Sequence, residues 1–258
     1  SFQVAYRIRP GAAEEHLSGT LHVQTEPDLA PFLMLRQGAL VPSDLPIYED
    51  HDDNVLRAEP GLYPDLLLPV DGPLTLSKQW QSVWVTVNPE RQAIRPGRYS
   101  IRLSLTVEGS GAVLASETFC LEVMKEKLPE QSLIHTMWFH TDCLATWYGD
   151  EVFSEAHWGR IRQYVETAVA HGINMILTPI FTPPLDTEVG GERPTVQLVD
   201  VWKSGDSYRF GFDKLERWVD LCREHGIKYF EFSHLFTQWG AGHAPKIMAT
   251  EDGETKRL

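Results

Sequence analysis

The sequence has no long hydrophobic run, no cluster of basic residues and little cysteine. No apolar stretch approaches the roughly 20 residues of a membrane-spanning helix, so we expect no membrane partner. Lysine and arginine number 23 against 36 acidic residues, which gives a formal charge of -13 at pH 7. Because no run of Lys or Arg could neutralise a phosphate backbone, nucleic acid is also excluded as an expected partner.

The three cysteines, Cys120, Cys143 and Cys222, lie far apart and show no C-x-x-C spacing. Neither a zinc site nor a disulfide framework is predicted, and we expect reduced, buried thiols. Reduced cysteine favours the cytoplasm over an oxidising compartment. The first residues, SFQVAYRIRP, alternate like a strand inside a domain and do not resemble a signal peptide.

The chain has 258 residues, of which 42% are hydrophobic, and it contains no long biased tract. This composition is that of an ordinary globular protein. The length fits two domains or one large barrel, so the choice between them depends on the hydrophobic periods along the chain.

From residue 1 to 128 the hydrophobic period is two, which predicts half-buried strands. Tyr99, Ile101 and Leu103 alternate with polar residues, and Gly109-Ser110-Gly111 joins this strand to the next one. We therefore predict that residues 1–128 form an immunoglobulin-like antiparallel β-sandwich.

Residues 48–76 are rich in Pro, Asp and Gly and show neither period, so we predict an ordered loop that braces the two sheets. The loop carries four acidic residues, Glu49, Asp50, Asp52 and Asp53, whose oxygen atoms are of the type that calcium prefers. Their spacing matches no EF-hand, and a solvated surface loop is the favoured interpretation.

After Leu128-Pro129 the pattern changes to strands that alternate with helices, which predicts parallel strands and a domain boundary. Three strands are predicted over residues 132–140, 173–180 and from 228. A helix over 154–170 begins with Ser154 as N-cap, and a second helix opens with Asp213 and Glu216 in capping-box spacing.

The first of these strands lacks a following G-x-G-x-x-G, and no G-x-x-x-x-G-K is present, so a dinucleotide- or nucleotide-binding domain is disfavoured. A (β/α)8 TIM-type barrel fits the pattern better, but it needs about 250 residues. We therefore predict that residues 129–258 are the first half of such a barrel and that the chain ends inside it.

Aromatic and polar residues gather where each predicted barrel strand ends, and the loops after the strands build the active site of a barrel. A sugar needs flat rings beside neutral donors and acceptors, and this mixture supplies both. We expect no cofactor. The candidate substrate-binding residues are His140, Asp142 and Trp147 after the first strand, and His234, Gln238 and Trp239 after the third.

Other chemistries have weaker support at these positions. His140 with Asp142, or His234 with His243, lacks the full ligand set of a known zinc signature, so no metal is expected. Cys143 lies three residues after His140, but this adjacency does not establish a nucleophile and base pair, and we interpret the thiol as packing.

Three motifs carry a resemblance to a known family. YPDLLLP at 63–69, HTMWFHTDCLA at 135–145 and FSHLFTQWGAGHAPKI at 232–247 resemble the bacterial proteins of domain of unknown function 4091, which are related to glycoside hydrolase family 123. The resemblance implies a sandwich before a catalytic barrel. It also implies β-N-acetylgalactosaminidase activity by a retaining mechanism in which the acetamido oxygen of the substrate is the nucleophile.

That family carries an adjacent Asp-Glu pair after a later barrel strand, and no residues of this chain match that position. Asp150-Glu151 has the right letters, but it precedes the first predicted barrel helix, where acidic residues favour the helix dipole. We therefore assign no catalytic residue and predict that the chain is the inactive amino-terminal part of a glycoside hydrolase for β-linked (N-acetyl)hexosaminides.

Two alternatives stay open. The first is a non-catalytic carbohydrate-binding or scaffold protein in which residues 1–128 bind the glycan. The second is a complete small enzyme with Asp142 and Glu231 as its carboxylate pair, which is disfavoured because Glu231 lies in the middle of a strand. The sugar, the linkage and the oligomeric state do not follow from the sequence.

Overall fold

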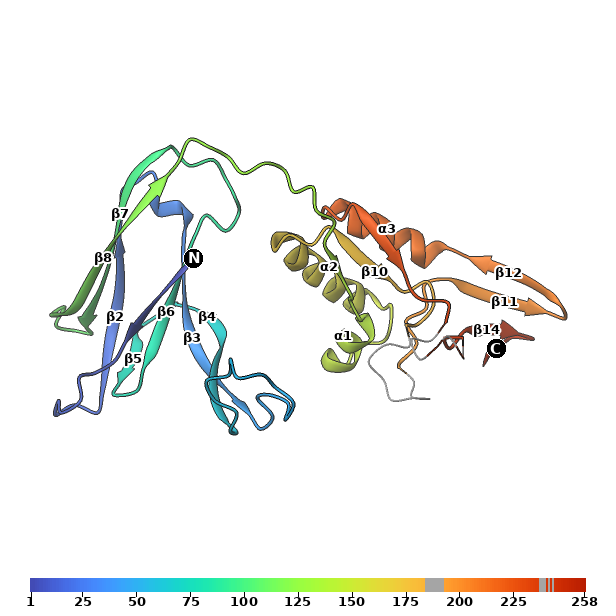
Figure 1. Ribbon diagram of the computed structural model, residues 1–258, viewed down its shortest axis with the longest axis horizontal. Helices are drawn as coiled ribbons and strands as arrows, with labels where there is room; N and C mark the ends of the chain where they lie inside the picture. Colours follow the sequence, from blue (N-terminus) through green and yellow to red (C-terminus); the bar gives the residue numbers. More distant parts are fainter. Residues whose placement is uncertain (184–192, 237–239, 241, 243) are drawn as a thin grey trace. The chain divides into compact units, whose positions relative to one another are not determined.

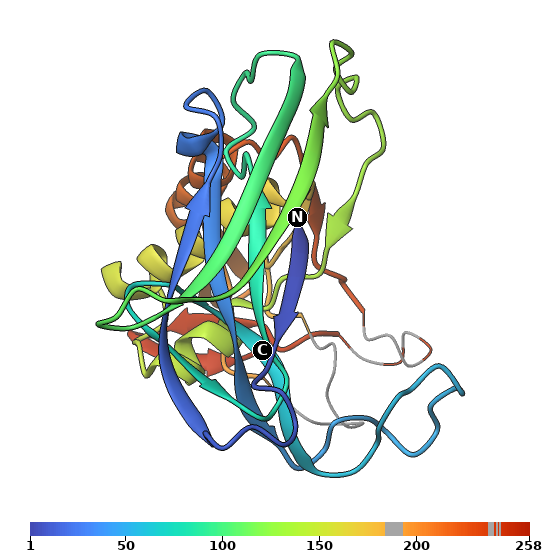
Figure 2. The same ribbon diagram turned by 90° about the vertical axis from the view of Figure 1, so that its left-hand side faces the viewer.

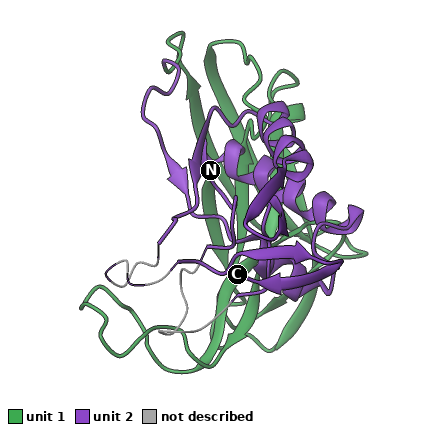
Figure 3. Cartoon of the chain, turned by 90° about the vertical axis from the view of Figure 1, so that its right-hand side faces the viewer, with its two compact units in different colours: residues 1–128 green, residues 129–258 purple. Residues whose placement is uncertain are grey.

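The computed structural model describes residues 1–183, 193–236, 240, 242 and 244–258. The chain consists of two compact units, Ser1–Leu128 and Pro129–Leu258 (Figure 1, Figure 3). The described residues contain no helix that is both long and apolar enough to cross a membrane.

The first unit is built from two antiparallel four-stranded sheets (Figure 2). Their strands are, in spatial order, β1 Phe2–Tyr6, β6 Gln81–Val87, β3 Leu33–Ser43 and β4 Gly61–Pro69, and β5 Leu74–Ser77, β2 His16–Gln24, β7 Gly97–Val107 and β8 Val113–Val123. A short 3-10 helix, η1 Ala30–Phe32, precedes β3.

Residues from both sheets share one core. Val83 and Val85 of β6 meet Leu76 of β5 and Leu103 and Leu105 of β7, and every one of them is less than 10% exposed. The alternation along β7 that predicted the strand also sets its buried face. The predicted hairpin of β7 and β8 is confirmed, whereas immunoglobulin topology stays a prediction.

The predicted loop over residues 48–76 is wrong in its second half, where β4 and β5 lie. The sequence hides β4 because Pro64 interrupts it, but β4 is the edge strand of its sheet, where a missing N–H costs no pairing on the outer side. The register against β3 shifts between Ala39 and Leu40, which leaves Asp65 as an extra residue. This bulge breaks the alternation on which the sequence prediction relied.

The second unit contains a three-stranded parallel sheet in the order β13-β10-β9, with helices between its successive strands along the chain (Figure 1). The elements are β9 Thr136–Met137, α1 Thr141–Tyr148, α2 Glu155–Ala170, β10 Met175–Thr178, α3 Asp213–Glu224 and β13 Tyr229–Phe232. Parallel strands with helical crossovers are the pattern that the sequence predicts, whereas the barrel itself stays a prediction.

The first predicted strand is much shorter than expected. The side chain of Asn174 accepts a hydrogen bond from the His135 N–H at 2.8 Å and donates one to the Leu133 carbonyl at 2.9 Å. These bonds replace strand pairing before Thr136. Beyond Met137 the chain soon enters α1, which the sequence analysis had missed and which ends at Gly149 in the left-handed conformation, φ 68°.

The helix α2 begins as predicted, because the Ser154 hydroxyl accepts a hydrogen bond from the His157 N–H at 3.3 Å. The capping box predicted for α3 is wrong: Phe212 holds the N-cap position without a side-chain cap, and Asp213 is the first helical residue. Asp213 and Glu216 still place negative charge in the first turn, where it favours the helix dipole.

The helices bury their apolar faces against one side of the parallel sheet. Trp158 and Ile161 of α2 and Trp218 of α3 are at most 2% exposed and pack with Ile176 of β10. Each such side chain stabilises the fold by about 1.5–3 kcal/mol relative to its exposed state. The opposite side of the sheet is therefore the one that can hold polar groups.

Segments that follow β10 and β13 form a second four-stranded sheet in this unit. Its order is β12 Ser207–Gly211, β11 Asp200–Ser204, β14 Met248–Glu251 and β15 Glu254–Arg257. The antiparallel pairing of β11 with β12 forms a hairpin around Gly205. A parallel pairing of Trp202 with Thr250 and of Lys203 with Glu251 joins the two hairpins.

Candidate functional site

The polar side of the parallel sheet follows from the strand register. Ile176 is paired with Met137 and Phe230, and Ile176 and Phe230 pack against the helices. Because side chains alternate along a strand, Glu231 and its register partner Leu177 point to the opposite face. Sequence reasoning had set Glu231 aside for its mid-strand position, yet that position directs it away from the helices.

Four residues at this face form what we call the Glu231 cluster: Thr136, Trp138, Glu231 and His234. The Glu231 carboxylate accepts a hydrogen bond from the Thr136 hydroxyl at 2.7 Å and another from the Trp138 indole N–H at 3.3 Å. The Trp138 ring meets the His234 ring edge-on, with 5.7 Å between centroids. Residues from both outer strands therefore meet at one place.

His234 lies half-buried just beyond β13. Its buried Nδ1 atom takes no hydrogen bond from any residue that the structure describes. An imidazole nitrogen beside an indole and a carboxylate can donate to or accept from a hydroxyl group. The Glu231 cluster thus combines an aromatic surface, an anionic acceptor and an imidazole.

The other predicted site residues lie in different surroundings. His140 is half-buried at the N-cap position of α1, while Trp147 on the same helix is 83% exposed. Asp142 is in the first turn of α1 and is buried. Gln238, Trp239 and His243 lie outside the described residues.

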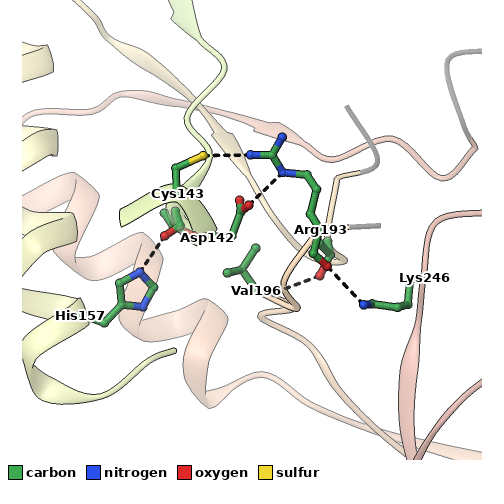
Figure 4. A network of polar contacts seen from close by, with 8 residues as sticks. Asp142, Cys143, His157, Arg193, Val196 and Lys246 are labelled. Atoms are coloured by element: carbon green, nitrogen blue, oxygen red, sulfur yellow. Dashed lines mark hydrogen bonds and ion pairs between the residues drawn. The ribbon is translucent and has the colours of Figure 1, made fainter. Parts of the chain in front are cut away.

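Asp142 belongs to a second group, the Arg193 network, which also contains Cys143, Arg193 and Lys246 (Figure 4). The Arg193 Nε donates to Asp142 at 3.0 Å, and both side chains are at most 10% exposed. Arg193 Nη2 lies 3.0 Å from the Cys143 sulfur, and the Lys246 ammonium donates to the Arg193 carbonyl at 3.2 Å. The ion pair with Arg193 holds the buried Asp142 carboxylate in position.

A buried histidine holds the helix that carries Asp142. The His157 Nδ1 accepts a hydrogen bond from the Phe153 N–H at 2.9 Å, and its Nε2 contacts the Thr141 carbonyl at 2.9 Å (Figure 4). Because a carbonyl only accepts, these contacts assign the proton to Nε2. His157 therefore ties the start of α1 to the start of α2.

Two further contacts fix the segments that follow β10 and β13. The Ser233 hydroxyl donates to the Phe181 carbonyl at 2.9 Å, which links the two strand ends. The Thr182 hydroxyl accepts from the Val196 N–H at 3.0 Å. The loops at the carboxyl ends of the strands are thus braced against each other.

The three thiols are free, but only Cys222 is buried, so the expectation of buried thiols is wrong for Cys120 and Cys143. Burial raises the pKa of Cys222 to about 12, which keeps it a protonated thiol at neutral pH. Among the described residues no group of three or more His, Cys, Asp or Glu gathers as a metal site. The described residues include the exposed acidic stretch 49–53, which the sequence analysis considered as a calcium ligand set.

Sequence reasoning missed Arg193 and His157 as residues of this region. Arg193 comes from the long segment after β10, and no pattern in the sequence marks its contact with Asp142, 51 residues away. In the sequence, His157 is one of many residues of the predicted helix, and only its burial in the structure distinguishes it. Asp150, which we had rejected as a catalytic residue, pairs with Arg160 at 3.6 Å.

Comparison with known proteins relates the chain to glycoside hydrolase family 123. Residues 138–258 match the family model described as the catalytic domain of glycoside hydrolase 123. Twelve chains of solved structures match as well. One is a family 123 glycoside hydrolase from Clostridium perfringens, studied for glycolipid glycan hydrolysis; it is 14% identical with a TM-score of 0.68, over 95% of this chain and 43% of that one.

No curated protein matches the sequence. The structural likeness at 14% identity shows a shared fold alone, and this chain spans less than half of the clostridial chain. The relation to family 123 that the motifs suggested is thus confirmed, whereas membership of the domain of unknown function 4091 stays a prediction.

Proposed function

We propose that this chain is the amino-terminal part of a glycoside hydrolase that acts on β-linked (N-acetyl)hexosaminides. The observation that carries the proposal is the Glu231 cluster, of which Trp138, Glu231 and His234 lie within the segment that matches the catalytic domain of family 123. An indole surface beside a carboxylate and an imidazole suits a ring that has C–H bonds on its faces and hydroxyl groups at its rim.

In this proposal Glu231 binds a sugar hydroxyl and does not act as the acid. Its carboxylate already accepts two hydrogen bonds, from Thr136 and Trp138, and a carboxylate with these donors keeps further lone pairs for a substrate hydroxyl. Asp142 forms an ion pair with Arg193, so in this proposal it supports the shape of the site and does not act as the base. The pairing of Asp142 with Glu231 as two catalytic carboxylates is therefore disfavoured.

The catalytic Asp-Glu pair is proposed to lie downstream of this chain, and the mechanism is proposed to be substrate-assisted. In such a mechanism the acetamido oxygen attacks the anomeric carbon, while a protonated carboxyl gives its proton to the leaving oxygen. The residues of this chain would supply binding and orientation. His140, His234, Gln238 and Trp239 are proposed as substrate contacts, and the exposed Trp147 is proposed as a stacking surface.

The direct test is hydrolysis of a chromogenic N-acetyl-β-galactosaminide by this 258-residue chain and by the protein extended to its natural carboxyl terminus. We expect activity only in the extended protein. Activity in the 258-residue chain would show that a catalytic carboxylate lies within it. Silence in both, with saturable sugar binding by the first unit, would favour a non-catalytic carbohydrate-binding protein.

Variants of the extended protein test the role of Glu231. Glu231→Gln keeps the shape and removes the charge, and we expect kcat/KM to fall about tenfold, the equivalent of about 1.4 kcal/mol. Asp206→Asn, in the turn between β11 and β12, is the matched control and leaves kcat/KM unchanged. Unchanged kcat/KM in Glu231→Gln would remove the cluster from the substrate site.

A further inference from the structure

The first unit contains a cavity of about 380 Å³ between its two sheets. This volume falls in the range of about 300–1,000 Å³ that is usual for small-molecule sites. The cavity is lined by residues of β1 and the segment after it, by Trp80 and Val83, by Leu21 of β2 and by parts of β7 and β8.

The position of the cavity follows from the strand order. β1 ends one sheet and β8 ends the other, so the core is closed at this side by side chains and not by a further strand. Ala115 of β8 is the register partner of the core residue Leu105, and the next inward residue, Glu117, is the partner of Leu103. The Ala115 methyl group and the Glu117 carboxylate of this edge strand leave a space that larger apolar side chains would fill.

The cavity has an apolar interior and a charged rim. Val83, Leu103 and Leu105 are each at most 9% exposed and supply its interior. Trp80 is 62% exposed, and the guanidinium carbon of Arg7 lies 4.3 Å from the centre of its ring. This stacking holds one cation beside the opening.

A second cation, Arg9, lies two residues further along the same segment and is exposed. The Arg9 side chain forms no ion pair with any residue of the fully described first unit, although its backbone carbonyl accepts from the Ala12 N–H. On a chain with a formal charge of -13, two exposed arginines beside one apolar opening form a local site of positive potential. Glu117 supplies the only carboxylate among the lining residues.

We propose that this cavity binds an amphipathic organic anion, with its apolar body against Val83, Leu103 and Leu105 and its anionic head at Arg7 and Arg9. A sugar suits the cavity less well, because Val83, Leu103 and Leu105 of its interior offer no hydrogen bonds to hydroxyl groups. The proposal concerns the first unit and does not depend on glycosidase activity in the second.

The test is isothermal titration of the full 258-residue chain with decanoate, with the decyltrimethylammonium cation and with N-acetylgalactosamine, each below any micellar concentration. We expect one decanoate per chain and binding of the cation at least about tenfold weaker, because its head is repelled by both arginines. Equal affinity for the two amphiphiles, no binding of decanoate, or binding of the sugar instead would overturn the proposal.

Three variants locate the binding. Arg9→Glu reverses the rim charge, and Ala115→Trp fills the cavity from the edge strand; we expect the first to weaken decanoate binding at least about tenfold and the second to abolish it. Arg98→Glu changes another exposed arginine, at the start of β7 and outside the lining, and keeps wild-type affinity. If Arg9→Glu binds like Arg98→Glu, the cavity is not the site, whether or not Ala115→Trp folds.

Discussion

At the scale of single residues, His157 shows how one buried side chain orders two helix starts. It is fully buried, and its two ring nitrogens bond to Phe153 and Thr141. Phe153 has a positive φ of 60°, a conformation that bulky residues rarely adopt. The hydrogen bond from its N–H to His157 helps to hold that conformation.

We predict that His157→Leu lowers the free energy of unfolding by about 2–4 kcal/mol, because it leaves the half-buried Phe153 N–H and the buried Thr141 carbonyl without these partners. His135→Leu, at an exposed position, is the control and should change stability by less than about 0.5 kcal/mol. Urea unfolding followed by circular dichroism measures both. A loss of the same small size in the two variants would contradict the role assigned to His157.

The sequence predicted part of the candidate site, namely the residue types and the strand ends at which they occur. It proposed His140, Asp142, Trp147 and His234 as candidates, which stay predictions, and it did not show that Asp142 is tied to Arg193. Local patterns report which face of an element is apolar, whereas an ion pair across 51 residues depends on how a long segment folds back. The contact of Trp138 with Glu231 is equally non-local, because Trp138 directly follows β9 and Glu231 lies in β13.

At the scale of elements, Gln197 joins the segment after β10 to the segment after β13. Its side-chain amide donates to the Val199 carbonyl at 2.7 Å and to the Met248 carbonyl at 2.9 Å, and it accepts from the Met248 N–H at 2.9 Å. Gln197 is 6% exposed, so these bonds form away from water. The amide thus continues the pairing of β11 with β14.

Gln197→Leu is predicted to destabilise the second unit by about 2–4 kcal/mol, since three buried or half-buried backbone groups lose their hydrogen-bond partner. The amide of Met248 should also exchange its hydrogen faster, and hydrogen exchange with mass spectrometry reads this directly. Gln163→Leu, on the exposed side of α2, serves as the control. Unaltered exchange at Met248 would show that the β11–β14 pairing holds without the amide.

Elements with strong local signals were predictable, and those that depend on edges were not. The N-cap of α2 was read correctly because Ser154 and the apolar period agree. β4 was missed because its proline and its bulge are tolerated only at the edge of a sheet, and no local pattern reveals an edge. The length of β9 was overestimated because, before Thr136, hydrogen bonds to the Asn174 side chain replace strand pairing.

At the scale of the whole molecule, the two units are joined by an exposed segment. Residues 124–138 are all exposed. This segment follows β8, contains the boundary between the two units after Leu128, and includes β9. Lys125 and Lys127 lie in this segment outside any strand or helix. Proteases act most readily on exposed chain without secondary structure.

Limited trypsin digestion should therefore cut first after Lys125 or Lys127 and release two fragments of similar size. Intact mass spectrometry identifies the cut sites. Replacing both lysines by glutamine should slow the first cut by about tenfold or more, by analogy with the dependence of proteolysis on local opening. First cleavage elsewhere, at Arg98 for example, would contradict a division into two stable units.

The shared sheet of β12, β11, β14 and β15 has a consequence for how this site could diversify. Loops that follow separate strands of a parallel sheet, such as the segments after β10 and β13, are usually free to change length independently of each other. In this protein the pairing of Trp202 with Thr250 and the hydrogen bonds of Gln197 join the segment after β10 to the segment after β13. An insertion in one segment therefore shifts its register against the other. We therefore expect that in relatives a change of length in one of these segments is accompanied by a change in the other, so that the two segments evolve as one unit.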